Sequence, residues 1–453
     1  MIALTYRMVQ EWTGGDAVHC PLDQAIQGLT IDSRDVAAGV LFVALPGTHT
    51  DGHVFVPDIW EKGGVALVSR DFSNLGGPQI RVASPLQAMG MLLRRYIEER
   101  RVTVVAVTGS VGKTSVKELS YAVLRTQYPT AASLGNYNTA IGLPLSFFGG
   151  PENASHFVAE MGMSAPGEIR QLTAIAPPDV AVISTIGPSH LEKLGSMQAI
   201  QSAKGEILEG LKADGVAVLN YENDWVRQLG KRCRQTVKWF GTTNGVHARV
   251  LSTQVQTDHT IMRIALEGEV VTVRLPWLGE HQAINVAAAL LVGRHLGVSL
   301  NDAVQGLQNV SAERSRIRVV TLGDLTLLED VYNASPLSAK AALDVLKSRP
   351  GRRVAVLGDM LELGLQEESG HREVGRYSKE RADRVLAVGE RARNIFAGAQ
   401  SVGVDAAWVA SPKDAAAWLK TGLQPHDVVL LKASRGMQFE QLAAGLKEWR
   451  RQQ

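Results

Sequence analysis

The segment from residue 102 to 124 constrains the fold of this chain most strongly. It reads VTVVAV (102–107), then TGSVGKTS (108–115), then VKELSYAVL (116–124). A continuous apolar run that ends in a glycine loop is typical of a parallel strand buried on both faces. The helix-like stretch after the loop completes a strand, loop and helix in the order that a phosphate cradle requires. The segment therefore predicts an α/β domain that binds a nucleotide.

The loop residues indicate how phosphate would be held. Gly109 and Gly112 let backbone N–H groups approach phosphate oxygens, Lys113 can neutralise the β- and γ-phosphates, and the Thr114 hydroxyl can ligate Mg²⁺. The spacing is shorter than the full Walker pattern, because the position five before Gly112 is Val107. The alternative is a glycine turn with a solvated lysine, but the flanking strand and helix favour a cradle for ATP.

Similar apolar runs recur along the chain and predict its organisation. HFVAEMG, DVAVISTIG and GVAVLNYEND follow the loop, and a further series, LTLLEDVYN, RRVAVLGDM, DRVLAVGE and DVVLLKAS, begins after residue 316. Their alternation with helix-like stretches predicts mostly parallel sheets covered by helices. At 453 residues the chain is long enough for about three domains. We predict an α/β protein with domains at residues 1–85, 86–313 and 314–453.

Composition excludes several classes of protein. Lys+Arg 47 against Asp+Glu 45 leaves a net charge of +2, which lacks the basic excess of nucleic-acid-binding proteins. No signal-peptide pattern opens the chain, and no apolar run approaches the roughly 18 residues that span a bilayer, so we expect a cytoplasmic protein without a membrane segment. Cys20 and Cys233 are too few for a disulfide framework or a cysteine-based metal site.

Two candidate metal ligands follow the loop. Glu160 stands at the end of the run HFVAEMG, where a carboxylate could join Thr114 around Mg²⁺. His190 follows the next strand, in STIGPSHLEKLGS. The alternatives are a surface glutamate at Glu160 and a solvated or hydrogen-bonded loop histidine at His190.

Lys204 lies in a predicted helix, MQAIQSAKGEILEGL. Helical spacing places it on the same face as Ile200 and Ile207, so its amine is directed toward the core. A lysine in that position must extend to solvent, find a partner or lose its charge.

The shortened loop, with its Gly-x-x-Gly-Lys-Thr spacing, resembles that of the Mur ligases and of their relatives, the folylpolyglutamate synthetases. The resemblance implies a small N-terminal α/β UDP-binding domain, a central P-loop-type ATPase domain with a mostly parallel sheet, and a C-terminal Rossmann-like α/β domain. It also implies that Lys204, in the AKGEI motif, is carbamylated by CO₂. Thr114 and Glu160 would then hold one Mg²⁺, and His190 and carbamylated Lys204 a second. Lys113, His190 and Lys204 would be the catalytic residues.

The N-terminal region looks like the UDP-sugar-binding domain of the Mur ligases that add the third residue and the terminal dipeptide, which folylpolyglutamate synthetases lack. The segments that carry this likeness are DSR (32–34) and LFVALPGTHTDGHVF (41–55). GNYN (135–138), followed by IGLPL (141–145), is similar to the dipeptide-adding members, although Thr139 replaces the second asparagine of a family pair. The implied contacts to the UDP substrate are Ser33, Arg34, Gly47, His53, Asn136 and Asn138.

The resemblance also implies a set of contacts to ATP. His281 and Asn285 lie at i and i+4 of a predicted helix, where capping or surface hydrogen bonding is the alternative role. The family's interdomain arginine follows a glycine, whereas this chain reads ERSRI (313–317); Arg316 fits best and Arg314 is close. The implied ATP contacts are Gly109, Ser110, Gly112, Lys113, Thr114, Ser115, His281, Asn285, Arg316, Asp330 and Asn333.

The last domain carries three segments similar to the dipeptide-adding members: DVYNASP (330–336), LGDMLELG (357–364) and KASRGM (432–437), the last with Ala433 in place of a glycine. The DYAH-type and DNPR sequences of the third-residue enzyme do not occur. The implied contacts to the amine substrate are Asp359, Ser434 and Arg435. The Arg435 guanidinium suits a substrate carboxylate, and a plain surface arginine is the alternative.

The resemblance therefore implies an ATP-dependent amide ligase of peptidoglycan precursor synthesis. It would activate the terminal carboxylate of UDP-N-acetylmuramoyl-tripeptide as an acyl phosphate and join it to D-alanyl-D-alanine, acting as a monomer whose domains close. The alternatives are a third-residue-adding Mur ligase, a folylpolyglutamate-synthetase-like ligase, or a nucleotide-gated binding protein without chemistry. The intact set of predicted metal and phosphate residues argues against the last.

Overall fold

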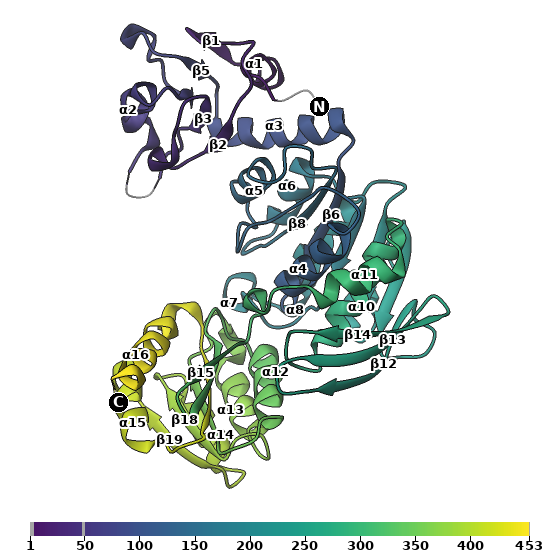
Figure 1. The fold of residues 1–453 in the computed structure, drawn as a ribbon, viewed down its shortest axis with the longest axis vertical. Helices are drawn as coiled ribbons and strands as arrows, with labels where there is room; N and C mark the ends of the chain where they lie inside the picture. The colour runs from purple at the N-terminus through teal and green to yellow at the C-terminus, as the bar shows by residue number, and fades with distance from the viewer. Residues whose placement is uncertain (1–3, 48–49, 453) are drawn as a thin grey trace.

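The computed structural model describes residues 4–47 and 50–452, which form three α/β units with the central unit between the other two (Figure 1). Each unit has its own sheet, of five, nine and six strands. The predicted three-domain α/β architecture is confirmed. Residues 48 and 49 of the quoted segment 41–55 lie outside the described residues.

The N-terminal unit has a sheet of order β1-β5-β4-β3-β2, in which only the β1–β5 pair is antiparallel. Its strands are β1 (Asp16–Val18), β2 (Gly28–Thr30), β3 (Val40–Val43), β4 (Val65–Val68) and β5 (Gln79–Arg81), and its helices are α1 (Tyr6–Thr13) and α2 (Val56–Glu61). Every β4 residue is buried, as expected for a central parallel strand. The long helix α3 (Pro85–Arg100), capped by Ser84, then leads the chain to the central unit (Figure 1).

The central unit has a sheet of order β14-β13-β12-β11-β10-β9-β6-β8-β7, parallel from β7 to β12 and antiparallel at β13 and β14. Its strands are β6 (Thr103–Thr108), β7 (Thr130–Ala132), β8 (His156–Glu160), β9 (Val180–Ile183), β10 (Val216–Asn220), β11 (Thr236–Gly241), β12 (Ala248–Val255), β13 (Thr260–Leu266) and β14 (Glu269–Leu275). Its helices are α4 (Lys113–Leu124), α5 (Gly142–Phe148), α6 (Glu168–Ile175), α7 (Leu191–Leu194), α8 (Met197–Glu209), α9 (Asp224–Gly230), α10 (Gln282–His295) and α11 (Leu300–Gln308).

Strand β6 is apolar at its four inner positions, 104–107, because both of its faces are buried. Val105 and Val107 pack into the hydrophobic cluster that contains helices α4 and α10, whereas Val104 and Ala106 pack into the cluster on the other face with α8. Alternate side chains of a strand point to opposite faces, so both faces need apolar residues. Each fully buried valine contributes about 1.5–3 kcal/mol to folding. The buried strand thus provides a rigid base for the loop at its carboxyl end.

The C-terminal unit has a sheet of order β15-β16-β20-β17-β18-β19, antiparallel only at the edge strand β15. Its strands are β15 (Arg318–Leu322), β16 (Leu325–Asp330), β17 (Arg353–Gly358), β18 (Arg384–Val388), β19 (Asp405–Val409) and β20 (Val428–Lys432). Its helices are α12 (Pro336–Lys347), α13 (Glu367–Tyr377), α14 (Arg393–Gln400), α15 (Pro412–Gly422) and α16 (Phe439–Arg451). Across the ranges that the structure describes, no helix combines the length and apolar character needed to cross a bilayer.

The central and C-terminal units touch at more than the chain that joins them. Val255, at the end of β12, packs against the hydrophobic cluster of the C-terminal unit. Arg349 of the C-terminal unit donates a hydrogen bond to the backbone oxygen of Thr257, in the turn after β12. The antiparallel extension of the central sheet therefore forms a second bridge between the two units.

Candidate active site

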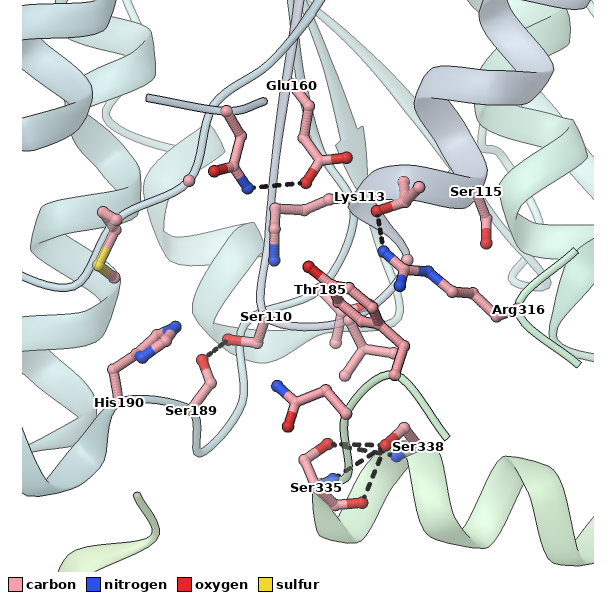
Figure 2. Close-up of a pocket in the computed structure, with 18 of the residues that line it drawn as sticks. Ser110, Lys113, Ser115, Glu160, Thr185, Ser189, His190, Arg316, Ser335 and Ser338 are labelled. Carbon is pink, nitrogen blue, oxygen red and sulfur yellow. Dashed lines mark hydrogen bonds between the residues drawn. The ribbon is translucent and has the colours of Figure 1, made fainter. Parts of the chain in front are cut away.

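A cavity of about 880 Å³ lies between the central and C-terminal units. It opens beyond the carboxyl ends of the parallel strands β6, β8 and β9, where open α/β sheets bind ligands. Figure 2 shows Lys113, Glu160, His190 and Arg316 around the cavity, with Ser335 and Ser338 of the C-terminal unit on another wall. The predicted residues that line it are Ser110, Gly112, Lys113, Thr114, Ser115, Asn138, Glu160, His190, Lys204, His281, Asn285, Arg316, Asp330 and Asn333.

The glycine loop joins β6 to α4 in a conformation that side chains would obstruct. Gly109 and Gly112 have φ of +151° and +90°, in the region that favours glycine. A Cβ on Gly109 would lie 2.1 Å from Ser184 Oγ, and one on Gly112 would lie 3.0 Å from Asn285 Oδ1. The backbone of the loop therefore passes close to β9 and α10, with α4 beginning directly after it.

The loop is also braced by hydrogen bonds to the segment after β9, two of them to backbone oxygens and one from a hydroxyl group. The Ser110 backbone N–H donates to Thr185 O at 2.6 Å, and Ser110 Oγ donates to Gly187 O at 2.8 Å. Ser189 Oγ donates to Ser110 Oγ at 2.9 Å (Figure 2). Sequence reasoning missed Thr185 and Ser189, although polar residues after a buried strand were a usable signal.

Two lysine amines meet at one backbone oxygen of the loop. Lys113 Nζ donates to Gly109 O at 2.7 Å, and Lys204 Nζ donates to the same oxygen at 3.1 Å. Lys204 is 2% exposed, as its helical spacing predicts. Burial lowers the pKa of Lys204 well below its usual range, and the positive charge of Lys113 lowers it further. Burial also lowers the pKa of Lys113, against the opposing effect of Glu160. Phosphate binding here would offset the repulsion between the two amines.

Glu160 and Thr114 offer oxygen ligands on the same side of the loop. Glu160 Oε1 accepts a hydrogen bond from Asn138 Nδ2 at 3.0 Å, whereas the buried Glu160 Oε2 has no hydrogen-bond partner among the described residues. Thr114 Oγ1 accepts a hydrogen bond from Arg316. A buried carboxylate oxygen without a donor is suited to a cation, and Mg²⁺ prefers oxygen ligands. The donor set of this corner therefore fits Mg²⁺.

His190 is held by a carboxylate from the C-terminal unit. Its Nδ1 lies 2.6 Å from Glu362 Oε2, and the backbone N–H of Glu192 donates to Glu362 O at 3.3 Å. Burial lowers the pKa of His190, and the negative charge of Glu362 opposes this. With Nδ1 against the Glu362 carboxylate, a neutral ring leaves Nε2 free to ligate a metal. Within the described ranges, no cluster of three or more His, Cys, Asp and Glu side chains could hold a metal.

The predicted ATP contacts His281 and Asn285 lie at the start of α10. His281 is the N-cap residue of α10, and its Nε2 lies 3.0 Å from Gln282 Nε2. Asn285 Nδ2 donates to Gln282 Oε1 at 3.0 Å. Gln282 therefore links the two predicted residues, and its position between them was a signal that sequence reasoning missed.

His281 predicts a pH dependence of stability. Burial lowers its pKa to about 4, with Asp330 opposing. The unfolded chain protonates this histidine near pH 6.5, so between about pH 6.5 and pH 4 the unfolded state binds more protons. The free energy of unfolding is therefore expected to fall as the pH decreases through this window. Thermal denaturation should show a larger decrease of Tm from about pH 7 to about pH 5 for the parent than for His281→Gln. Equal decreases of Tm in the two proteins would contradict the role of His281 in this pH dependence.

The side chains of Arg316 and Arg314 point to different places in the structure. Arg316 lines the cavity, and its guanidinium carbon lies 4.0 Å from the centre of the Tyr332 ring. Arg314 turns away and pairs with Glu118 Oε2 at 2.5 Å. The geometry therefore favours Arg316 as the nucleotide contact.

Asp330 and Asn333 line the cavity but already have protein partners. Lys432 Nζ donates to Asp330 Oδ2 at 2.6 Å and to Asn333 O at 3.0 Å. Lys432 and Asp330 are both buried, so they form a compensated ion pair. A nucleotide contact from Asp330 would use its second carboxylate oxygen.

Five of the residues predicted to contact the UDP substrate do not line the cavity. Ser33, Arg34, Gly47 and His53 belong to the N-terminal unit, and Asn136 lies in an exposed loop.

His53 differs from the others because it is buried. Its Nδ1 lies 2.7 Å from Asp51 Oδ1, and its Nε2 accepts a hydrogen bond from the Ser69 backbone N–H at 3.0 Å. Both ring nitrogens are thus occupied, and His53 fastens its loop to the end of β4.

The predicted amine-binding residues, Asp359, Ser434 and Arg435, are not among the residues that line the cavity. Asp359 Oδ1 accepts a hydrogen bond from the Ala392 backbone N–H at 2.8 Å, and burial raises the pKa of Asp359. Ser434 Oγ accepts one from the Leu361 backbone N–H at 2.9 Å. Arg435 is exposed, with its guanidinium carbon 5.9 Å from the ring centre of Tyr332. Of the three, Arg435 is therefore the one whose side chain is exposed beside a residue that lines the cavity.

Comparison with known proteins covers nearly the whole chain. Three family models match it: "Mur ligase family, catalytic domain" at residues 25–112, "Mur ligase middle domain" at 107–293, and "Mur ligase, glutamate ligase domain" at 315–435. The UDP-N-acetylmuramoyl-tripeptide--D-alanyl-D-alanine ligase of Bacillus subtilis is 37% identical over 459 residues, with 99% of each chain covered.

Solved structures give the same result. The fold is similar to that of MurF from Acinetobacter baumannii, with a TM-score of 0.88, 29% identity and 99% of each chain covered. It is also similar to MurF ligase from Thermotoga maritima in complex with ADP, with a TM-score of 0.83, 29% identity, and 94% of this chain and 98% of that one covered.

Proposed function

Because the chain belongs to the Mur ligase family, we propose that it joins D-alanyl-D-alanine to the terminal carboxylate of UDP-N-acetylmuramoyl-tripeptide in an ATP-driven reaction. The protein is an ATP-dependent ligase that forms a peptide bond in peptidoglycan synthesis. The observation that carries the choice of substrates is 37% identity to a ligase of that name across 99% of both chains. The third-residue-adding and folylpolyglutamate-synthetase-like alternatives are not favoured by that match.

The reaction requires activation, because a carboxylate is a poor electrophile. The tripeptide carboxylate oxygen attacks the γ-phosphorus of ATP, and the bond to the bridging oxygen breaks to release ADP. The amine of D-alanyl-D-alanine then attacks the acyl phosphate carbon, and phosphate leaves as the amine loses its proton. Catalysis of the first step rests on position and charge. Lys113 would exchange its bond to Gly109 O for the β- and γ-phosphates.

The residues of the cavity support two metal positions in this proposal. Thr114 and Glu160 would hold one Mg²⁺, and His190 and a carbamylated Lys204 the second. Bound Mg²⁺ withdraws charge from the γ-phosphate. The buried Lys204 amine, with its lowered pKa, is suited to carbamylation because only a neutral amine attacks CO₂. Arg316 would leave Thr114 for the nucleotide and so free the hydroxyl as a ligand.

The three units support a division of labour, which we assign to residues 1–85, 86–313 and 314–453. The first would hold the UDP end through Ser33 and Arg34, with Asn136 of the second unit as a further contact. The second would bind ATP, and the third would bind the amine through Ser434 and Arg435. An acyl phosphate hydrolyses in contact with water, so the units would close around it. We place the reaction in the cytoplasm, where ATP is supplied, and propose that the protein acts as a monomer.

Phosphate release tests the proposed function. Phosphate is expected only when ATP, UDP-N-acetylmuramoyl-tripeptide and D-alanyl-D-alanine are all present, because each completes one step of the reaction. Parallel reactions with tripeptides ending in diaminopimelate or in lysine would identify the third residue. Phosphate release in the absence of both UDP-N-acetylmuramoyl-tripeptide and D-alanyl-D-alanine, or release only with folate and glutamate, would contradict the proposal.

A further inference from the structure

A short segment, residues 311–317, joins the central unit to the C-terminal unit. On the central side, Trp277 Nε1 donates to Ser311 O at 2.9 Å, and Trp277 is part of the central hydrophobic cluster. On the other side, Ile317 is buried in the hydrophobic cluster of the C-terminal unit. The joint, residues 311–317, therefore has one end fixed in each core.

Arg314 attaches the middle of the joint to α4. Its Nη1 lies 2.5 Å from Glu118 Oε2, and its guanidinium carbon lies 5.4 Å from the ring centre of Tyr121. Glu118 has a side chain only 12% exposed, and its other oxygen lies 2.5 Å from Nζ of Lys117, whose side chain is fully buried. Lys117 also donates to Ser133 O at 2.8 Å. The acceptor of Arg314 is thus itself held in place, unlike that of an ordinary surface ion pair.

Arg316, two residues further on, contacts the same helix face one turn earlier. It donates to Thr114 Oγ1, and Thr114 precedes Glu118 by four residues on α4. The intervening Ser315 is extended, with φ −65° and ψ 146°. Two extended residues span about 6.6–7 Å and four helical residues rise about 6 Å, so the two arginines match successive turns of α4.

We propose that Arg314 is a positioning residue for nucleotide binding. Its pair with Glu118 fixes the central side of the joint on α4, and this fixation directs Arg316 into the cavity. Rotation of the C-terminal unit is then confined to residues 315–317. The inference rests on the proposed function in one respect, that the cavity binds ATP.

Among Arg314, Glu118 and Lys117, Arg314 is the residue that we expect can be changed without a folding defect. Loss of Glu118 would leave Lys117 buried without its carboxylate, whereas Arg314→Gln leaves the Lys117–Glu118 pair intact. Arg318 supplies a matched control, because it is exposed, lies two residues beyond Arg316, and makes no ion pair in the part of the chain that the structure describes.

The test compares Arg314→Gln, Arg314→Lys and Arg318→Gln with the parent by steady-state kinetics and by calorimetric titration with ADP. Arg314→Gln is expected to raise the KM for ATP and the Kd for ADP on the order of fivefold, with kcat within about twofold and Tm unchanged. Arg314→Lys should restore part of the affinity, and Arg318→Gln should match the parent.

The outcomes separate the two proposals. A parent that binds no ADP and releases no phosphate would contradict the proposed function. A normal parent with equal KM and Kd values for Arg314→Gln and Arg318→Gln would overturn the positioning role alone. If Arg314→Gln lowers Tm, the Arg314→Lys variant decides between the readings. An Arg314→Lys protein with the Tm of the parent and an affinity for ADP between those of the parent and Arg314→Gln supports the positioning role. Parental affinity for ADP in both variants overturns it.

Discussion

Replacing Lys113 with alanine is expected to lower kcat/KM for ATP by about 10³-fold, because its ammonium is the cation of the loop placed to meet the phosphates. The fold should survive the change. Burial lowers the pKa of Lys113, because holding a positive charge in this environment costs free energy. The measurement is steady-state phosphate release together with Tm.

A control for the loss of one positive charge is Lys193→Ala, at an exposed position of α7 near His190. It should retain parental kcat/KM, while Lys113→Arg should recover only part of the activity because a guanidinium does not fit the place of a compact ammonium. A folded Lys113→Ala protein with parental kcat/KM would contradict the proposed role of the loop.

Replacing Lys204 with alanine is expected to lower kcat at least about 100-fold, and short carboxylates such as acetate are expected to restore part of it. The buried side chain ends at Gly109 O, so its removal leaves room for a small acid at the position of the proposed carbamate. Rescue would be measured as kcat against acetate concentration at fixed ionic strength.

Two comparisons make this result specific. The same acetate series should not restore Lys113→Ala, because that residue is proposed to supply a positive charge. Lys204→Arg keeps a charge but forms no carbamate, and it should stay inactive without rescue because its side chain fills the space. Parental activity in Lys204→Ala would leave the lysine with a structural role only.

Local patterns predicted a large part of this fold. The apolar run before Gly109 became β6, the stretch after it became α4, and Glu160 ends β8 as expected. Helical spacing also predicted the burial of Lys204. These features follow from periodicity within one element, which the sequence carries directly. The same reasoning could have identified Lys117, a lysine on the buried side of α4.

The contacts between units could not be predicted in this way. Arg316 and Thr114 are separated by 202 residues, and Glu362 reaches His190 from the other unit. Such contacts depend on how two folded bodies pack, and no single segment records that arrangement. The burial of His53 could likewise not be predicted, because Asp51 and Ser69 become its partners only after the loop folds against β4.

The second bridge between the central and C-terminal units has a mechanical consequence. The C-terminal unit is attached through residues 315–317 and through the contact of Arg349 with Thr257 O. A third contact, of Glu362 with His190 and with the Glu192 backbone N–H, also holds the unit. Once that contact opens, a rigid body held at the two remaining points keeps one degree of freedom, which is rotation about the line through those points. While both attachments hold, Ser434 and Arg435 can only travel along fixed arcs past the cavity, and their distances to Lys113 change together as functions of a single angle.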